Sequence, residues 1–184
     1  MIIDNPQGLR LDIFTIKKFT QNGVIADTNI LFNLFISKYI DCNENKNYLC
    51  KKARISKKEI SCLNDVLANL RIPKLIITPH IFSEFINKIR NELKEDCKGI
   101  NKNSCEEIKN FFEIYVNKND LINHQKFLDF GNDISLIFAT EKQIKDYKYA
   151  TIISFDGRFL KEFFGNEKNE NILAINLGIL KYFY

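Results

Sequence analysis

The chain is poor in the residues and runs that mark several classes of protein. Only 7 Gly and 3 Pro occur in 184 residues, against 45% hydrophobic and 27% charged residues. This composition is ordinary for a folded domain and excludes collagen-like and disordered chains. No apolar run approaches the roughly 20 residues that a membrane-spanning helix needs. Residues 1–19 contain Asp4 and Asp12 and lack a small-residue cleavage site, so we do not expect them to be a secretory signal.

Cysteine is present, but not in the patterns of a metal or redox site. The chain has 5 cysteines, an odd number, and no C-x-x-C pair: Cys42, Cys50, Cys62, Cys97 and Cys105. Zinc sites and redox motifs usually contain closely paired cysteines. We therefore expect reduced thiols in a cytoplasmic protein.

Several catalytic and nucleotide-binding motifs are also missing. Neither G-x-x-x-x-G-K-[ST] nor G-x-G-x-x-G occurs, which excludes the common nucleotide-binding loops at the level of motif. The histidines, His80 and His124, are not accompanied by a Ser or Cys nucleophile motif, so a hydrolytic triad is poorly supported. His80 and Glu84 are four residues apart on an expected helix and could share a metal, although a helix-surface pair is the commoner meaning of this spacing.

The chain is weakly basic, and part of that charge is concentrated. There are 27 Lys and Arg against 23 Asp and Glu, which gives a formal net charge of +4 and is compatible with a polyanionic partner. A basic segment without an acid contains Lys51, Lys52, Arg54, Lys57 and Lys58. This segment predicts contacts to an RNA backbone; the alternative is a solvated loop and helix start.

Short apolar runs alternate with amphipathic segments along the chain. We expect strands at 23–26, 74–78, 150–154 and 172–175. Helices are expected over 29–39, from the Ser56-x-x-Glu59 capping box, from Thr78–Pro79 to about residue 96, from the Ser104-x-x-Glu107 capping box through Tyr115, from Asp133, and over 158–164. Apolar strands separated by helices indicate a parallel sheet that is covered on both faces. The predicted fold is α/β, with three α/β/α layers and a central, mainly parallel sheet of about four or five strands.

The domain organisation is predicted to be simple. The chain contains no internal repeat, low-complexity tract or Pro/Gly/Ser linker, so residues 1–184 are expected to form a single domain. Residues 1–22 form an N-terminal extension to it. Residues 40–72, a polar loop and a capped helix, are expected to be an elaboration.

Two of the expected strands lead directly into an aspartate. Asp27 follows the first strand, and Asp156 follows the strand at 150–154 after one intervening residue. In open α/β sheets, ligands bind at the carboxyl ends of the strands, which makes both acids candidates for a functional site. Turn chemistry is the alternative, as an Asx-turn or helix N-cap at Asp27 and a turn with Gly157 at Asp156.

Two further acids belong to helices. Glu84 lies one and a half turns into an otherwise apolar helix, and Asp133 stands at a helix start, where an N-cap role is a strong alternative. If the four carboxylates converge, they repel one another strongly unless a cation neutralises them. Oxygen ligands suit hard cations such as Mg²⁺, and one or two such ions can assist phosphodiester hydrolysis.

Four segments together resemble the PIN-domain ribonucleases, a family that includes the VapC toxins. "VIADTNILFNLF" (24–35) is similar to the first strand and helix of the family, and "LIITPHIFSEFI" (75–86) to its second segment, in which Thr-Pro precedes a glutamate. "NDISLIFATEK" (132–142) is similar to the third segment and "ATIISFDGRFL" (150–160) to the fourth. Each segment is weak by itself, but the ordered set is specific and spans most of the chain.

The resemblance implies a cytoplasmic, metal-dependent endoribonuclease. Asp27, Glu84, Asp133 and Asp156 would be its catalytic acids and would bind one or two Mg²⁺ or Mn²⁺ ions, with Asp27 and Asp156 as the anchors. Thr28, Asn29 and Ser154 would be supporting polar residues, and cleavage of RNA would leave a 3′-hydroxyl and a 5′-phosphate. Many relatives of this size are toxins silenced by an antitoxin protein, and many form homodimers, so both are partners to test; no membrane is expected.

Two other functions fit part of the sequence. A non-catalytic PIN-fold RNA-binding or assembly module has no need of four mutually repelling carboxylates. A phosphoryl-transfer enzyme with an aspartate nucleophile usually has Asp-x-Asp after its first strand, whereas Asp27 is followed by Thr28 and Asn29.

Overall fold

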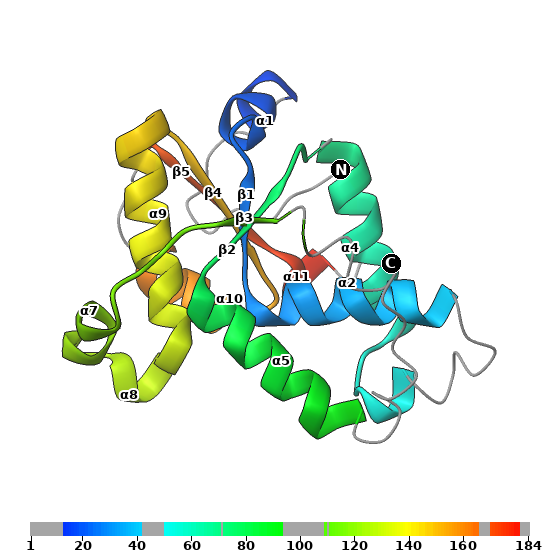
Figure 1. The fold of residues 1–184 in the computed structure, drawn as a ribbon. Coiled ribbons are helices and arrows are strands. Elements are labelled where there is room, and N and C mark those ends of the chain that lie inside the picture. The colour runs from blue at the N-terminus through cyan, green and yellow to red at the C-terminus, as the bar shows by residue number, and fades with distance from the viewer. Residues whose placement is uncertain are drawn as a thin grey trace.

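A computed structural model describes residues 13–41, 50–70, 72–93, 109, 111–165 and 170–180. Its centre is a five-stranded, all-parallel sheet in the order β3-β2-β1-β4-β5 (Figure 1). The strands are β1 (Val24–Ala26), β2 (Leu75–Ile77), β3 (Phe112–Glu113), β4 (Ala150–Ser154) and β5 (Ile172–Asn176). The α/β class and the mainly parallel sheet of about four or five strands are therefore confirmed.

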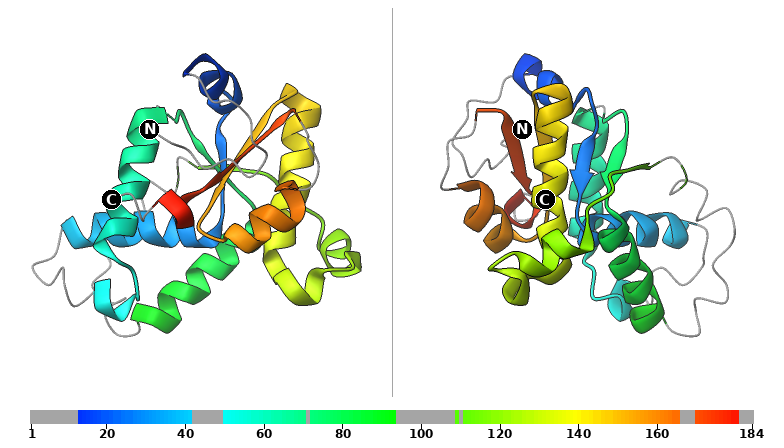
Figure 2. Two further views of the ribbon diagram at one scale, coloured as in Figure 1. Left: turned by 180° about the vertical axis from the view of Figure 1, so that it is seen from behind. Right: turned by 60° about the vertical axis from the view of Figure 1, so that its left-hand side comes forward.

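Helices surround this sheet in an arrangement compatible with three α/β/α layers. They are α1 (Ile13–Thr20), α2 (Thr28–Asp41), α4 (Lys57–Leu70), α5 (Pro79–Leu93), α7 (Lys118–Asn123), α8 (Phe127–Phe130), α9 (Ile134–Tyr147), α10 (Gly157–Leu160) and α11 (Leu177–Leu180). Helix α2 packs on α4 and α5, and α9 runs alongside β1 and β4 (Figure 2). Within the described residues, no helix combines the length and apolar character that crossing a membrane requires.

The strands are apolar throughout because both of their faces are covered. Every residue of β1, β2, β4 and β5 is buried, whereas both residues of β3, at the edge of the sheet, are exposed. Phe32 on α2 and Phe85 on α5 are among the largest fully buried side chains of the core. Burial of side chains on both faces explains why the strands lack polar alternation.

Two predicted helix starts have the expected capping hydrogen bonds. Ser56 N donates to Glu59 Oε2 over 2.9 Å, and Glu59 N donates to Ser56 Oγ over 3.1 Å, which is a complete capping box before α4. Ile81 N donates to Thr78 Oγ1 over 3.2 Å at the start of α5. The Ser104-x-x-Glu107 box lies outside the described residues.

The helix predicted to run through Tyr115 is wrong over its last part, because Phe112–Glu113 form β3 instead. Ile114 N donates to Ile77 O over 2.9 Å, and the side chains of Ile114 and Val116, two residues apart, are buried. Phe112 and Tyr115 are exposed, so their spacing does not report a helical core face. An edge strand this short carries too few residues to show a pattern in the sequence.

The strand order reverses between β1 and β4. From β1 the chain moves to β2 and β3 on one side of the sheet, and β4 and β5 lie on the other side. Ala26 pairs with Ile153 in the parallel register, so Asp27 follows β1 beside Ser154. The reversal of strand order at β1 and β4 is the point at which open α/β sheets bind ligands. The predicted extension contains α1 and the predicted elaboration contains α4; the division into domains itself stays a prediction.

Candidate active site

Asp27 follows the end of β1, and both of its carboxylate oxygens accept hydrogen bonds. Its side chain is 3% exposed. Ile30 N donates to Asp27 Oδ1 over 2.8 Å, and the hydroxyl of Ser154 donates to Asp27 Oδ2. The helix-cap interpretation of Asp27 is therefore right for one oxygen, while the other faces the end of β4.

Ser154 joins Asp27 to the second strand-end acid, Asp156. The Ser154 hydroxyl donates to Asp27 and accepts from Asp156 N over 2.8 Å. Asp156 Oδ1 accepts from Phe159 N over 2.9 Å as the N-cap of α10. The turn-and-cap alternative for Asp156 is thus confirmed for one oxygen, and Ser154, predicted as a supporting polar residue, fixes the spacing of both acids.

Asp133 occupies the N-cap position of α9, as the capping alternative predicts. Among the described residues, however, its side chain makes no capping hydrogen bond. The pKa of Asp133 is raised from 3.8 to about 7. Burial is the largest cause, and the negative charges of Asp27, Glu84 and Asp156 contribute the rest of the increase. The carboxylate of Asp133 therefore lies within electrostatic range of the other three.

We call Asp27, Glu84, Asp133 and Asp156 the four-acid cluster. Burial is also the largest cause that raises the pKa of Asp27, from 3.8 to about 6; the charge of Asp156 adds to it. The hydrogen bonds from Ser154 and Ile30 act in the opposite direction. All the acids predicted for the site interact, although they come from separate segments of the chain.

Lys88 is a residue of this site that sequence reasoning missed. It lies on α5 one turn after Glu84, and its charge lowers the pKa of both Asp27 and Asp133. Lys88 Nζ donates to Asn29 Oδ1, which gives the predicted polar residue Asn29 a partner. The i, i+4 spacing of Glu84 and Lys88 on one helix was the available signal.

Two hydroxyls behind the cluster connect its helices. Thr78 Oγ1 and Ser135 Oγ lie 2.7 Å apart and are both fully buried, so the first turn of α5 is tied to the first turn of α9. This bond sets the start of the helix carrying Glu84 against the start of the helix that follows Asp133. Thr28, also predicted, is buried, and its Oγ1 has no hydrogen-bond partner among the described residues.

Gly157 allows the chain to pass close to the end of β5. A Cβ atom at Gly157 would meet Asn176 Nδ2 at 2.6 Å, and Asn176 Oδ1 accepts from Gly178 N over 2.9 Å. The absence of a side chain at 157 therefore lets Asp156 cap α10 directly beside the sheet. Asn176 ends β5 in register with Ser154 and is a further polar group near this edge.

The donor set suits a hard divalent cation. It consists of carboxylate oxygens, and a cation would offset both the burial and the repulsion that raise the pKa of Asp133. Within the described part of the chain, no three His, Cys, Asp or Glu side chains lie close enough to enclose one ion. Mg²⁺ is often held by one or two carboxylates and otherwise by water, which does not require a group of three such side chains.

The basic segment lies at the opposite end of α5 from the cluster. Lys52 Nζ donates to Leu93 O over 2.9 Å, so this lysine contacts the last residue of α5. That residue is about 13 Å along the helix axis from Glu84. The other predicted RNA-contact side chains of the segment are exposed: Lys51, Arg54, Lys57 and Lys58.

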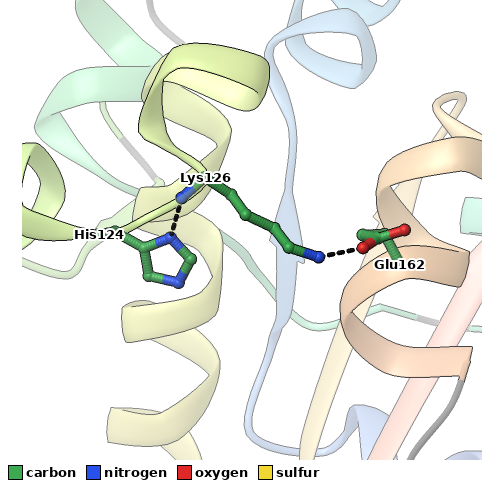
Figure 3. A network of polar contacts seen from close by, with 3 residues as sticks. All are labelled: His124, Lys126 and Glu162. Atoms are coloured by element: carbon green, nitrogen blue, oxygen red, sulfur yellow. Dashed lines mark hydrogen bonds and ion pairs between the residues drawn. The ribbon is translucent and has the colours of Figure 1, made fainter.

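The histidines are not part of the cluster's hydrogen bonding. His124 Nδ1 accepts from Lys126 N over 3.2 Å, and Lys126 forms an ion pair with Glu162 (Figure 3). The His124 ring packs on Phe163 with a centroid distance of 5.8 Å. Burial lowers the pKa of His80, whose Nδ1 has no partner among the described residues.

The cysteines with a described environment are both free and buried. They are Cys50 and Cys62, and burial raises the pKa of Cys62 to about 11, so that it is an unreactive thiol. The other cysteines, Cys42, Cys97 and Cys105, lie outside the described residues.

No family model, curated protein sequence or solved structure matches this chain. The family resemblance of residues 24–160 therefore stays a prediction.

Proposed function

We propose that this chain is a metal-dependent endoribonuclease of the PIN type that hydrolyses RNA phosphodiester bonds at the four-acid cluster. One observation carries the proposal: carboxylates from four separate segments interact beside the strand-order reversal. Burial, and after it the charges of the other three acids, raises the pKa of Asp133 to about 7. Buried carboxylates that also repel one another are costly to ionise without a cation. The order of the four sequence segments is the second support.

In this proposal Asp27 and Asp156 anchor the cation, and Glu84 and Asp133 complete its surroundings. A bound Mg²⁺ or Mn²⁺ would lower the pKa of a water molecule and neutralise charge on the phosphodiester. Ser154 holds the Asp27 carboxylate in place through its hydroxyl and supports the backbone of Asp156. In this proposal the protein orients the carboxylates and supplies the negative charge that binds the cation.

RNA as the substrate rests on the resemblance and on the charge of the chain. The net charge is +4, and Lys51, Arg54, Lys57 and Lys58 are exposed on the segment that reaches the end of α5. The proposal includes action in the cytoplasm as the toxin of a toxin–antitoxin pair. An antitoxin or a homodimer partner would find exposed apolar side chains at Ile122 and Leu128, which are 52% and 96% exposed.

The direct test is cleavage of single-stranded RNA with and without Mn²⁺ or Mg²⁺. Asp27→Asn and Asp156→Asn preserve side-chain shape and an oxygen for the helix cap, so both variants should fold and lose cleavage. Asp146→Asn, an exposed acid on α9, is the matched control and should cleave normally. End-labelling should reveal 3′-hydroxyl and 5′-phosphate products.

Two results would overturn the assignment. Full activity in both Asp27→Asn and Asp156→Asn would remove the cluster from the reaction. RNA binding without cleavage, together with a thermal midpoint that Mn²⁺ leaves unchanged, would instead support a non-catalytic RNA-binding or assembly module.

A further inference from the structure

Lys88 is held in a fixed place beside the four-acid cluster by two contacts to α2. Its ammonium donates to Asn29 Oδ1 and lies over the Phe32 ring, 5.1 Å from the centroid. Asn29 and Phe32 are three residues apart and lie on the same side of the helix. An exposed surface lysine would sample many rotamers, whereas this half-buried one is directed.

The ammonium retains capacity for another ligand. It has three N–H donors, and one of them goes to Asn29. None of the other described residues accepts a hydrogen bond from it. Asn29 lies two residues after Asp27, so its hydrogen bond to Lys88 places the ammonium beside the cluster.

A phosphodiester approaching the cluster meets predominantly negative charge. A fixed cation at the edge of the cluster offsets that repulsion and supplies donors to phosphate oxygens. Lys88 is the cation that the described residues place there.

We propose that Lys88 binds a non-bridging oxygen of the RNA phosphate at the four-acid cluster and is held ready for it by Asn29 and Phe32. This inference rests on the proposed function and assigns a substrate-binding residue to it. Its competitor is a purely internal role, in which Lys88 is only a counter-ion for the acids. The two roles predict different effects of removing the Lys88 charge on the affinity for RNA and on the affinity for the metal.

The first experiment measures steady-state cleavage at saturating Mn²⁺ for the wild type, Lys88→Met and Lys88→Arg. Loss of the ammonium should raise KM for RNA about tenfold, because a charge-assisted hydrogen bond to phosphate is lost. Lys88→Arg should recover most of that loss. Lys142→Met, an exposed lysine on α9, is the matched control and should leave KM unchanged.

The second experiment measures binding rather than cleavage, so that failure of the proposed function is seen separately. Fluorescence anisotropy of a labelled single-stranded RNA is followed over a salt series for Asp156→Asn alone and combined with Lys88→Met. The slope of log Kd against log salt should fall by about 0.7, the value for one lost phosphate contact. Circular dichroism verifies folding, and Lys88→Gln replaces Lys88→Met if that variant unfolds.

Unchanged RNA affinity and salt slope, with tighter Mn²⁺ binding in Lys88→Met, would overturn the inference in favour of the counter-ion role. A loss of affinity in an assay where the wild type cleaves no RNA would uphold Lys88 as a phosphate contact and reject the nuclease.

Discussion

The hydroxyl of Ser154 donates a hydrogen bond to the carboxylate of Asp27 across the junction of β1 and β4. The same hydroxyl accepts from the backbone of Asp156, so one side chain sets the positions of both strand-end acids. This arrangement depends on the parallel register of the two strands.

Ser154→Ala removes a single hydroxyl group but should lower both the stability of the protein and its affinity for Mn²⁺. Asp27 would lose a donor that lowers its pKa, and Asp156 N would lose its acceptor. We expect a loss of about 1–3 kcal/mol of unfolding free energy, because buried polar groups are left unpaired. Urea unfolding measures this loss, and Mn²⁺ titration at pH 7 should show weaker binding.

Ser37→Ala is the matched control for Ser154→Ala, since among the described residues the Ser37 hydroxyl bonds only to the carbonyl of Leu34, one turn earlier on α2. It should leave Mn²⁺ binding unchanged. Equal Mn²⁺ affinity in Ser154→Ala and the wild type would contradict the positioning role.

The metal-free protein should lose stability as the pH rises towards neutrality. Burial raises the pKa of Asp27 to about 6 and of Asp133 to about 7, both from 3.8. Between about pH 4 and pH 7 the folded state therefore binds more protons than the unfolded state. The contribution of these groups is fully present below pH 3.8 and is lost as the pH passes their folded pKa values.

Thermal midpoints in a chelating buffer from pH 4.5 to 8 measure this dependence. Asp133→Asn should flatten it, and saturating Mn²⁺ should reverse it, because metal binding favours the deprotonated acids. A midpoint in chelator that rises steadily over the same range, in the wild type and the variant alike, would contradict the assignment.

Alanine substitutions of Asp133 and Asp156 should distinguish the loss of a helix-capping hydrogen bond from the loss of a buried negative charge. Asp156→Ala removes the acceptor for Phe159 N and should cost about 1 kcal/mol in unfolding free energy. Asp133→Ala removes no capping bond within the described residues and should leave stability at pH 8 unchanged or higher. Urea unfolding without metal compares them; equal losses would show that Asp133 has a structural role.

Ser56→Ala should destabilise the protein by about 1 kcal/mol through loss of the capping box at α4. A double-mutant cycle with Glu59→Ala measures the coupling between the two residues. RNA cleavage by the folded variant should equal that of the wild type, since the box lies outside the four-acid cluster. Additive losses would show that the two bonds do not act as one unit.

The sequence was sufficient for features that depend on local chemistry. Apolar runs predicted β1 and β4, and the Ser56 and Thr78 caps were confirmed by their hydrogen bonds. Asp27 follows the first of these runs and was predicted as a site residue for that reason. Each of these features depends on neighbours within a few positions.

Features that depend on tertiary contacts were missed or misjudged. The pairing of β3 with β2 is created by a neighbouring strand and not by the pattern around Phe112. Lys88 reaches the cluster only because α5 packs on α2. Asp133 has the residue type and place of an N-cap, but its orientation towards the other acids is decided by the packing of α9.

The pairing of β1 with β4 also determines when the four-acid cluster can assemble during synthesis. Ser154 and Asp27 are separated by 127 positions, yet they share one hydrogen bond. During synthesis a growing chain has completed α2 and α5 long before β4 can join β1. Under the proposed function, the ribosome that makes this protein is thus not exposed to its nuclease activity until residue 156 has left the exit tunnel.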